Sequence, residues 1–201
     1  MTEELPLFPL QTVLFPGGLL SLKVFEARYL DLASTCLREK RPFGVVALRK
    51  GQEVRRGEEP IVFEDVGVVA QILDLDGAQP GILQLRCRGL QRFRIGGTRQ
   101  QPDGLWIGEV ETLPDDEVVV PAETMLETVR GLANAIASLK GKGVEPFEAP
   151  YHFDNAGWVA NRWCEILPIP LAAKQRLMEL PDARVRLALV DEFLRGQGVV
   201  K

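Results

Sequence analysis

The chain has 201 residues, of which 46% are hydrophobic and 26% charged, and its formal net charge is −4. This length fits one large domain or two small ones, and the composition is that of a globular protein with a sizeable core. The same values exclude disordered, collagen-like and coiled-coil chains, and the acidic balance argues against a wholly basic nucleic-acid binder.

The first part of the chain is predicted to be rich in β-strands. Apolar runs bounded by glycine and proline turns predict strands over 12–15, 19–25, 43–48, 61–75, 82–88, 90–95 and 105–113. Apolar residues at helical spacing predict a helix over 26–40, and the polar stretch 51–60 is expected to be a surface loop.

The second part is predicted to be helical. Four helices are expected over 121–139, 154–167, 170–181 and 182–196, with Asp154 and Asp182 as N-caps and Gly196 at the C′ position. The acidic run 115–117 is expected to be a solvated turn between the two parts. Strands followed by helices indicate an α+β protein with a β-rich domain, 1–116, and a helical domain, 117–201.

Motifs of common enzymes are missing from the sequence. The only histidine is His152, and no phosphate-binding loop or G-x-S-x-G motif occurs. The three cysteines, Cys36, Cys87 and Cys164, lie far apart, which favours reduced, buried thiols. A cysteine nucleophile paired with His152 is the one enzymatic hypothesis left. We therefore expect no enzyme activity, no cofactor and no metal site.

The N-terminal region predicts neither a signal peptide nor a membrane helix. Glu3 and Glu4 stand where a signal peptide carries positive charge. The uncharged run 5–22 contains three prolines and two glycines, so it cannot form a continuous helix in lipid. We expect a cytoplasmic protein that does not enter the membrane.

Two groups of residues are candidates for binding. Four arginines stand at even-numbered positions: Arg86, Arg88, Arg92 and Arg94. Because side chains alternate along a strand, strands over this region would place all four on one face of the sheet. That face could bind RNA, or it could be a solvated surface paired with Glu109 or Glu111, which we favour. Tyr151, Phe153, Trp158 and Trp163 could line an apolar groove between the two domains, or they could be packing residues.

Several motifs together resemble a known family. They are Leu5-Pro-Leu-Phe-Pro-Leu10, Val13-Leu-Phe-Pro-Gly17, Leu22-Lys-Val-Phe-Glu-Ala-Arg-Tyr29, Phe43-Gly-Val-Val46, Gly67-Val-Val-Ala70 and Gly89-Leu-Gln-Arg-Phe-Arg-Ile95, with Lys174-Gln175 and Arg186-Leu187 in the helical part. These stretches resemble the N-terminal, substrate-binding domain of Lon protease in a stand-alone form. The resemblance covers nearly the whole chain.

The resemblance implies a PUA-like β half-barrel followed by a helical bundle. It also implies a module that binds exposed or unfolded protein segments without cutting them, because the sequence has neither the ATPase nor the protease motifs of Lon. Its partners would be protein or peptide clients rather than nucleic acid, and no oligomeric state is indicated. In Lon-type domains the start of the first helix is thought to engage substrate, which corresponds here to Glu26 and Arg28.

Overall fold

The computed structural model describes residues 3–53 and 61–201, and it confirms the α+β class. The chain divides into two compact units, Met1–Pro114 and Asp115–Lys201. Most of the predicted loop 51–60 lies outside the described residues. Within the described ranges no helix is both long and apolar enough to cross a membrane.

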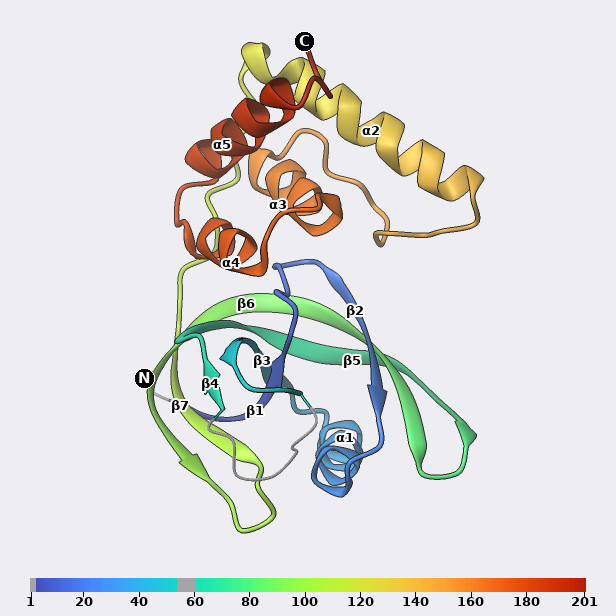
Figure 1. The fold of residues 1–201 in the computed structure, drawn as a ribbon, viewed down its shortest axis with the longest axis vertical. Coiled ribbons are helices and arrows are strands. Elements are labelled where there is room, and N and C mark those ends of the chain that lie inside the picture. Colours follow the sequence, from blue (N-terminus) through green and yellow to red (C-terminus); the bar gives the residue numbers. More distant parts are fainter. Residues whose placement is uncertain (1–2, 54–60) are drawn as a thin grey trace. The chain divides into compact units, whose positions relative to one another are not determined.

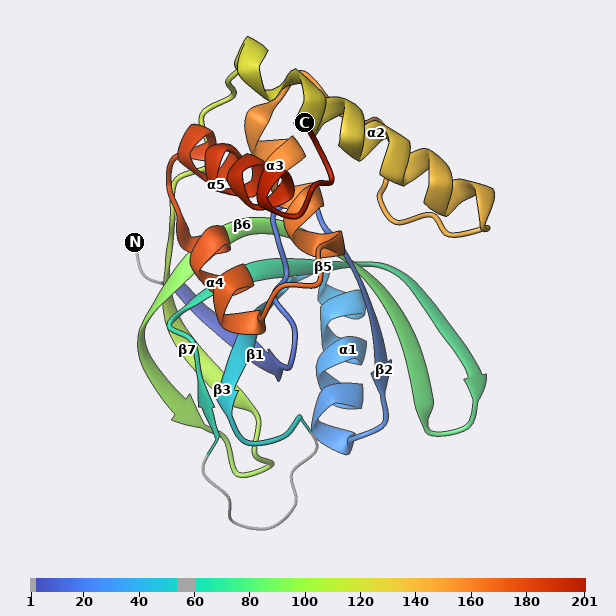
Figure 2. The same ribbon diagram turned by 45° about the horizontal axis from the view of Figure 1, so that its top comes forward.

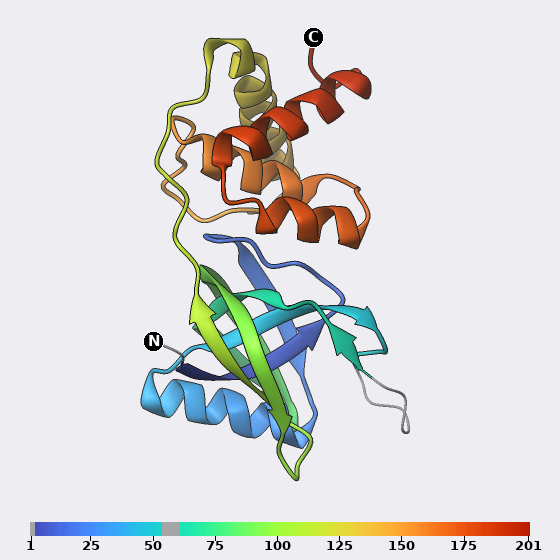
Figure 3. The ribbon, with the colours of Figure 1, turned by 90° about the vertical axis from the view of Figure 1, so that its left-hand side faces the viewer.

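The first unit is a curled sheet with one helix (Figure 1). Its elements are β1 (Glu3–Leu10), β2 (Leu19–Val24), α1 (Ala27–Glu39), β3 (Phe43–Lys50), β4 (Val62–Phe63), β5 (Val66–Gln79), β6 (Ile82–Gln100) and β7 (Trp106–Thr112). The strands follow the order β1-β7-β6-β5-β3-β4, and β1 also pairs with β3 in parallel, so five strands form a ring. Strand β2 pairs with the first half of β6, and Figures 2 and 3 show α1 along one side of the sheet.

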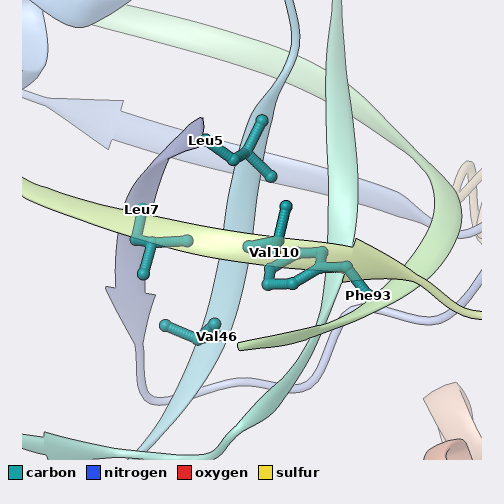
Figure 4. Packing of buried hydrophobic residues seen from close by; sticks show 5 residues of the cluster. All are labelled: Leu5, Leu7, Val46, Phe93 and Val110. Atoms are coloured by element: carbon teal, nitrogen blue, oxygen red, sulfur yellow. The ribbon is translucent and has the colours of Figure 1, made fainter. Parts of the chain in front are cut away.

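The core of this unit lies inside the curled sheet. Figure 4 shows five of its buried side chains, contributed by β1, β3, β6 and β7: Leu5, Leu7, Val46, Phe93 and Val110. Strands of alternating pattern place every second side chain on this inner face, which removes its apolar area from water.

The first strand lies at Glu3–Leu10 and not at 12–15, so that prediction was wrong. The sequence here contains Pro6 and Pro9, which favoured a turn-rich interpretation. However, β1 pairs with β7 through residues 3–7 and with β3 through residues 7–10. Each proline therefore lies beside one partner strand only, and its missing N–H group can face away from the ladder.

The glycine and proline turn expected at 16–18 is present and is held against β6. Gly17 has a φ of 72°, and its N–H donates to the Gly89 carbonyl at 2.8 Å. The Gly89 N–H in turn donates to the Gly18 carbonyl at 2.8 Å. A Cβ atom on Gly89 would lie 2.3 Å from the Phe15 carbonyl oxygen, so only glycine permits this close approach. Two of the family motifs thus meet at one backbone contact.

The second unit is helical. Its elements are the short 3₁₀ turn η1 (Glu123–Met125) and the helices α2 (Leu126–Gly141), α3 (Ala156–Ile166), α4 (Leu171–Glu179) and α5 (Ala183–Gly196). The Asp182 cap is confirmed, because its carboxylate accepts from the Arg184 N–H at 2.8 Å. Two other end signals were misplaced by one or two residues. Asn155 rather than Asp154 caps α3, and Gly198, with a φ of 68°, rather than Gly196 occupies the C′ position of α5.

A buried arginine joins the linker to the helices. Arg186 is 1% exposed, and its Nη1 lies 2.5 Å from an Asp116 carboxylate oxygen and 3.0 Å from the Asn161 side-chain oxygen. It also donates to the carbonyls of Leu177 and Leu180. Asp116 is therefore part of the helical unit. The prediction that it is a solvated turn residue was wrong.

Candidate functional site

A groove of about 460 Å³ lies in the β-rich unit, between β2, the end of β1 and the start of α1. Strand β2 contributes residues 20–24 to its wall, and Phe25 and Glu26 continue that wall to the helix. Phe8 and Tyr29 stack in it with ring centroids 3.9 Å apart and an interplanar angle of 8°. Burial raises the pKa of Tyr29 to about 12, so its hydroxyl remains protonated at neutral pH.

Phe25 is the largest exposed apolar residue of this groove, with 48% of its surface accessible. In the sequence it is part of the motif Leu22-Lys-Val-Phe-Glu-Ala-Arg-Tyr29. The alternation of β2 could have indicated its position, because Leu22 and Val24 are buried and Phe25 is out of phase with them. The next residue, Glu26, lies on the rim of the same groove.

Arg28, the other candidate at the start of α1, is buried with 6% exposure. Its Nη1 donates to the Gly104 carbonyl at 2.9 Å, and its Nη2 donates to Glu26 Oε2 at 2.8 Å. Its guanidinium also lies 4.6 Å from the Tyr29 ring centroid. Arg28 therefore ties α1 to the β6–β7 turn and positions Glu26, which differs from the expectation of an accessible contact residue.

The helical unit brings three predicted aromatic residues together. The ring of Trp158 lies 5.9 Å from that of Tyr151 and 5.4 Å from that of Phe153, and each of the three is half-buried. The buried ring of Phe147 packs edge-on against Trp158 at 6.2 Å. These residues, which we call the Trp158 cluster, hold the loop before α3 against that helix.

Trp163 does not join the Trp158 cluster. It is buried, and its indole N–H donates to the Thr128 carbonyl of α2 at 3.0 Å. Five residues separate the two tryptophans, which places them about 140° apart around α3. Helical spacing alone thus shows that one groove could not be lined by both side chains.

An ion pair lies beneath the Trp158 cluster. The Arg162 guanidinium carbon is 5.8 Å from the Trp158 ring centroid, and its Nε is 2.9 Å from Glu165 Oε2. Glu165 is 17% exposed, and burial raises the pKa of its carboxyl to about 7 despite the opposing charges of Arg162 and Lys174. Burial also lowers the pKa of Arg162.

Glu165 should make the stability of the helical unit depend on pH. Its folded pKa lies above the unfolded value, so its contribution is fully present below about pH 4.5 and is lost as the pH rises through about 7. We expect the free energy of unfolding to fall between pH 5 and pH 8, by up to about 3 kcal/mol. Denaturant titrations at both values should show this fall for the wild type and for the surface control E192Q. A fall of equal size in E165Q would contradict the assignment.

The four arginines do not form one exposed face. Arg86 and Arg94 are exposed, Arg88 is half-buried, and Arg92 is 4% exposed and donates to the Pro114 carbonyl at 3.1 Å. The pairing of β6 with β5 shifts by one residue between Gly89 and Arg92, which marks a bulge. Such a bulge exchanges the two faces of the strand, so parity counted across it was misleading.

The cysteines are unsuited to nucleophilic catalysis. All three are free and buried. Burial raises the pKa of Cys87 and Cys164 to about 12, and it also raises the pKa of Cys36, so the reactive thiolate is disfavoured. In the described ranges no group of three or more histidine, cysteine or acidic residues could hold a metal ion.

Comparison with known proteins identifies the family. The family model described as the ATP-dependent protease La (LON) substrate-binding domain matches residues 4–196. The chain belongs to this family. In this member of the family, the groove lies between β2 and the start of α1.

Curated relatives and solved structures agree with this family. The chain is 28% identical to Lon protease of Anaeromyxobacter dehalogenans over 94% of its own length and 23% of that protein. It is 27% identical to Lon protease 2 of Myxococcus xanthus over 96% of its own length and 23% of that protein. The chain thus spans about a quarter of these relatives. A Lon N-terminal domain protein from Xanthomonas campestris superposes with a TM-score of 0.74 at 31% identity, covering 94% of this chain and 96% of that one.

Proposed function

We propose that this protein is a non-catalytic recognition module of the cytoplasm that binds exposed, unfolded segments of other proteins. The observation that carries the proposal is the groove at the start of α1, with its stacked aromatic floor and its exposed Phe25. An apolar groove with a few polar groups on its rim suits unfolded chains, because they expose apolar side chains that folded proteins bury. The family model, which describes a substrate-binding domain, supports the same reading.

The candidate residues carry unequal weight in this proposal. Glu26 and Phe25 belong to the groove, and we propose both as client contacts. Tyr151, Phe153 and Trp158 are proposed as a second contact surface, since each is only half-buried. Arg28 and Trp163 are buried and act through packing and hydrogen bonds. The comparisons give no support to the alternative of RNA binding.

Binding to a permanently unfolded protein tests the proposal. Reduced, carboxymethylated lactalbumin should bind, whereas native lactalbumin should not, as measured by fluorescence anisotropy of the labelled client. F25A should weaken binding about tenfold, which corresponds to about 1.4 kcal/mol, without lowering the free energy of unfolding. L189A removes a similarly exposed residue of α5 and serves as the matched control. Equal binding of native and unfolded lactalbumin, or equal loss in both variants, would count against the proposal.

A further inference from the structure

One edge of β2 has no partner strand among the described residues. Strand β2 pairs with β6 in the register Leu19↔Arg88 to Val24↔Leu83, and no other pairing of β2 occurs in the described sheet. The opposite side of β2 forms the wall of the groove, to which every residue from Leu20 to Val24 contributes. Consecutive residues can all line a groove when a strand presents its edge to it, because successive side chains point to opposite faces.

One contact shows which residues of β2 point their backbone groups towards β6 and which point them towards the open edge. The Gly89 N–H donates to the Gly18 carbonyl, and these residues continue the register of Leu19 with Arg88. In an antiparallel ladder, hydrogen-bonded and non-bonded residue pairs alternate along each strand. Counting in steps of two from Gly18, the backbone N–H and C=O groups of Leu20, Leu22 and Val24 point towards β6. The backbone groups of Ser21 and Lys23 therefore face the groove.

We propose that the client binds as an added strand, in extended conformation, along the Ser21–Lys23 edge of β2. The inference rests on the proposed function and specifies how the groove recognises its client. An extended backbone can satisfy the N–H and C=O groups of this edge, whereas a helix has already used its own. The partner is thus an unfolded polypeptide segment.

The side chains around the edge specify the kind of segment. Alternate residues of an added strand would face the apolar floor, where Phe8 and Tyr29 are stacked. On the rim, the Glu26 carboxylate is paired with Arg28, the Glu53 carboxylate accepts from the Gln11 N–H, and Lys23 adds an ammonium group. The charges of the rim are thus largely matched, and a segment with apolar residues at every second position fits the floor.

A proline substitution tests the backbone contact. S21P removes the N–H that faces the groove and leaves the β2–β6 hydrogen bonds in place, because proline is tolerated on an open strand edge. S21A removes the same hydroxyl and keeps the N–H, so it is the matched control. We expect S21P to weaken binding of carboxymethylated lactalbumin at least tenfold and S21A to bind as the wild type does. Equal binding by S21P and S21A would overturn strand addition.

Modified peptides test the same contact on the unchanged protein. The probe is a labelled seven-residue peptide that alternates valine and threonine and carries one lysine. N-methylation of the backbone at one alternate set of residues should abolish binding, and N-methylation of the other set should preserve it. If both sets bind equally while lactalbumin still binds, strand addition is wrong and the proposed function stands. If lactalbumin itself does not bind, both fail, and self-association of the protein through β2 would likewise contradict a client strand.

Discussion

Replacing Arg186 with methionine should destabilise the helical unit by about 3–5 kcal/mol. The variant R186M leaves the carboxylate of Asp116 without its cation in a site where water reaches little of it. It also removes the hydrogen bonds that Arg186 donates to the carbonyls of Leu177 and Leu180 and to the Asn161 side chain. A buried acceptor that loses its partner bears the full desolvation penalty, so the loss exceeds that of one ordinary hydrogen bond.

A neighbouring ion pair supplies the control for R186M. Arg184 lies two residues away and approaches Glu117 at 3.7 Å, with 64% of its side chain exposed. R184M should change stability by less than about 0.5 kcal/mol, because exposed pairs contribute little. Denaturant unfolding combined with hydrogen exchange would assign each change to a unit, which is needed because both units contain tryptophan. Similar losses of stability in R186M and R184M would show that the buried hydrogen bonds of Arg186 contribute no more than an exposed ion pair.

Replacing Gly89 with alanine should destabilise the β-rich unit by about 3 kcal/mol, at the upper end of what over-packing costs. The added methyl group would lie 2.3 Å from the Phe15 carbonyl oxygen and 3.0 Å from Leu14 Cγ. The first of these atoms is backbone, so no rotamer change relieves the clash. The turn would have to separate from β6 and lose the hydrogen bonds between Gly17, Gly18 and Gly89.

Gly96 offers the matched control in the same strand. The nearest atom to a Cβ there is the Glu109 carbonyl oxygen at 3.8 Å, which is an ordinary contact. G96A should be neutral or slightly stabilising, because alanine restricts the unfolded chain. Equilibrium unfolding in urea should therefore separate the two variants clearly. A G89A protein as stable as G96A would mean that the turn moves freely away from β6.

The sequence predicted the elements whose signals are local. Helices α1 and α5 follow from apolar spacing, and Asp182 was found as a cap because its own side chain makes the capping bond. Asn155 was missed because Asp154 beside it is an equally good cap by type, and only the backbone decides between them. The Trp158 cluster was found in part, since Tyr151 and Phe153 precede α3 closely in the chain.

The features that sequence could not predict depend on distant residues. The bulge that places Arg92 on a different face from Arg86 and Arg88 exists only in the pairing of β6 with β5. Asp116 was interpreted as solvated because its partner, Arg186, lies 70 residues later. The open edge of β2 likewise follows from which strands pair, and pairing is decided by the whole sheet.

The pairing of β1 with β7 also determines when the sheet can close during synthesis. Glu3 lies opposite Val110, so β1 can pair with β7 only after about a hundred further residues have been translated. At roughly 5–20 residues per second, the nascent chain exposes the edge of β1 for about 5–20 s. The ring therefore closes late, after a search over a long loop. A ribosome-bound chain that stops before residue 106 should still expose this edge, and it should itself be a substrate for chaperones.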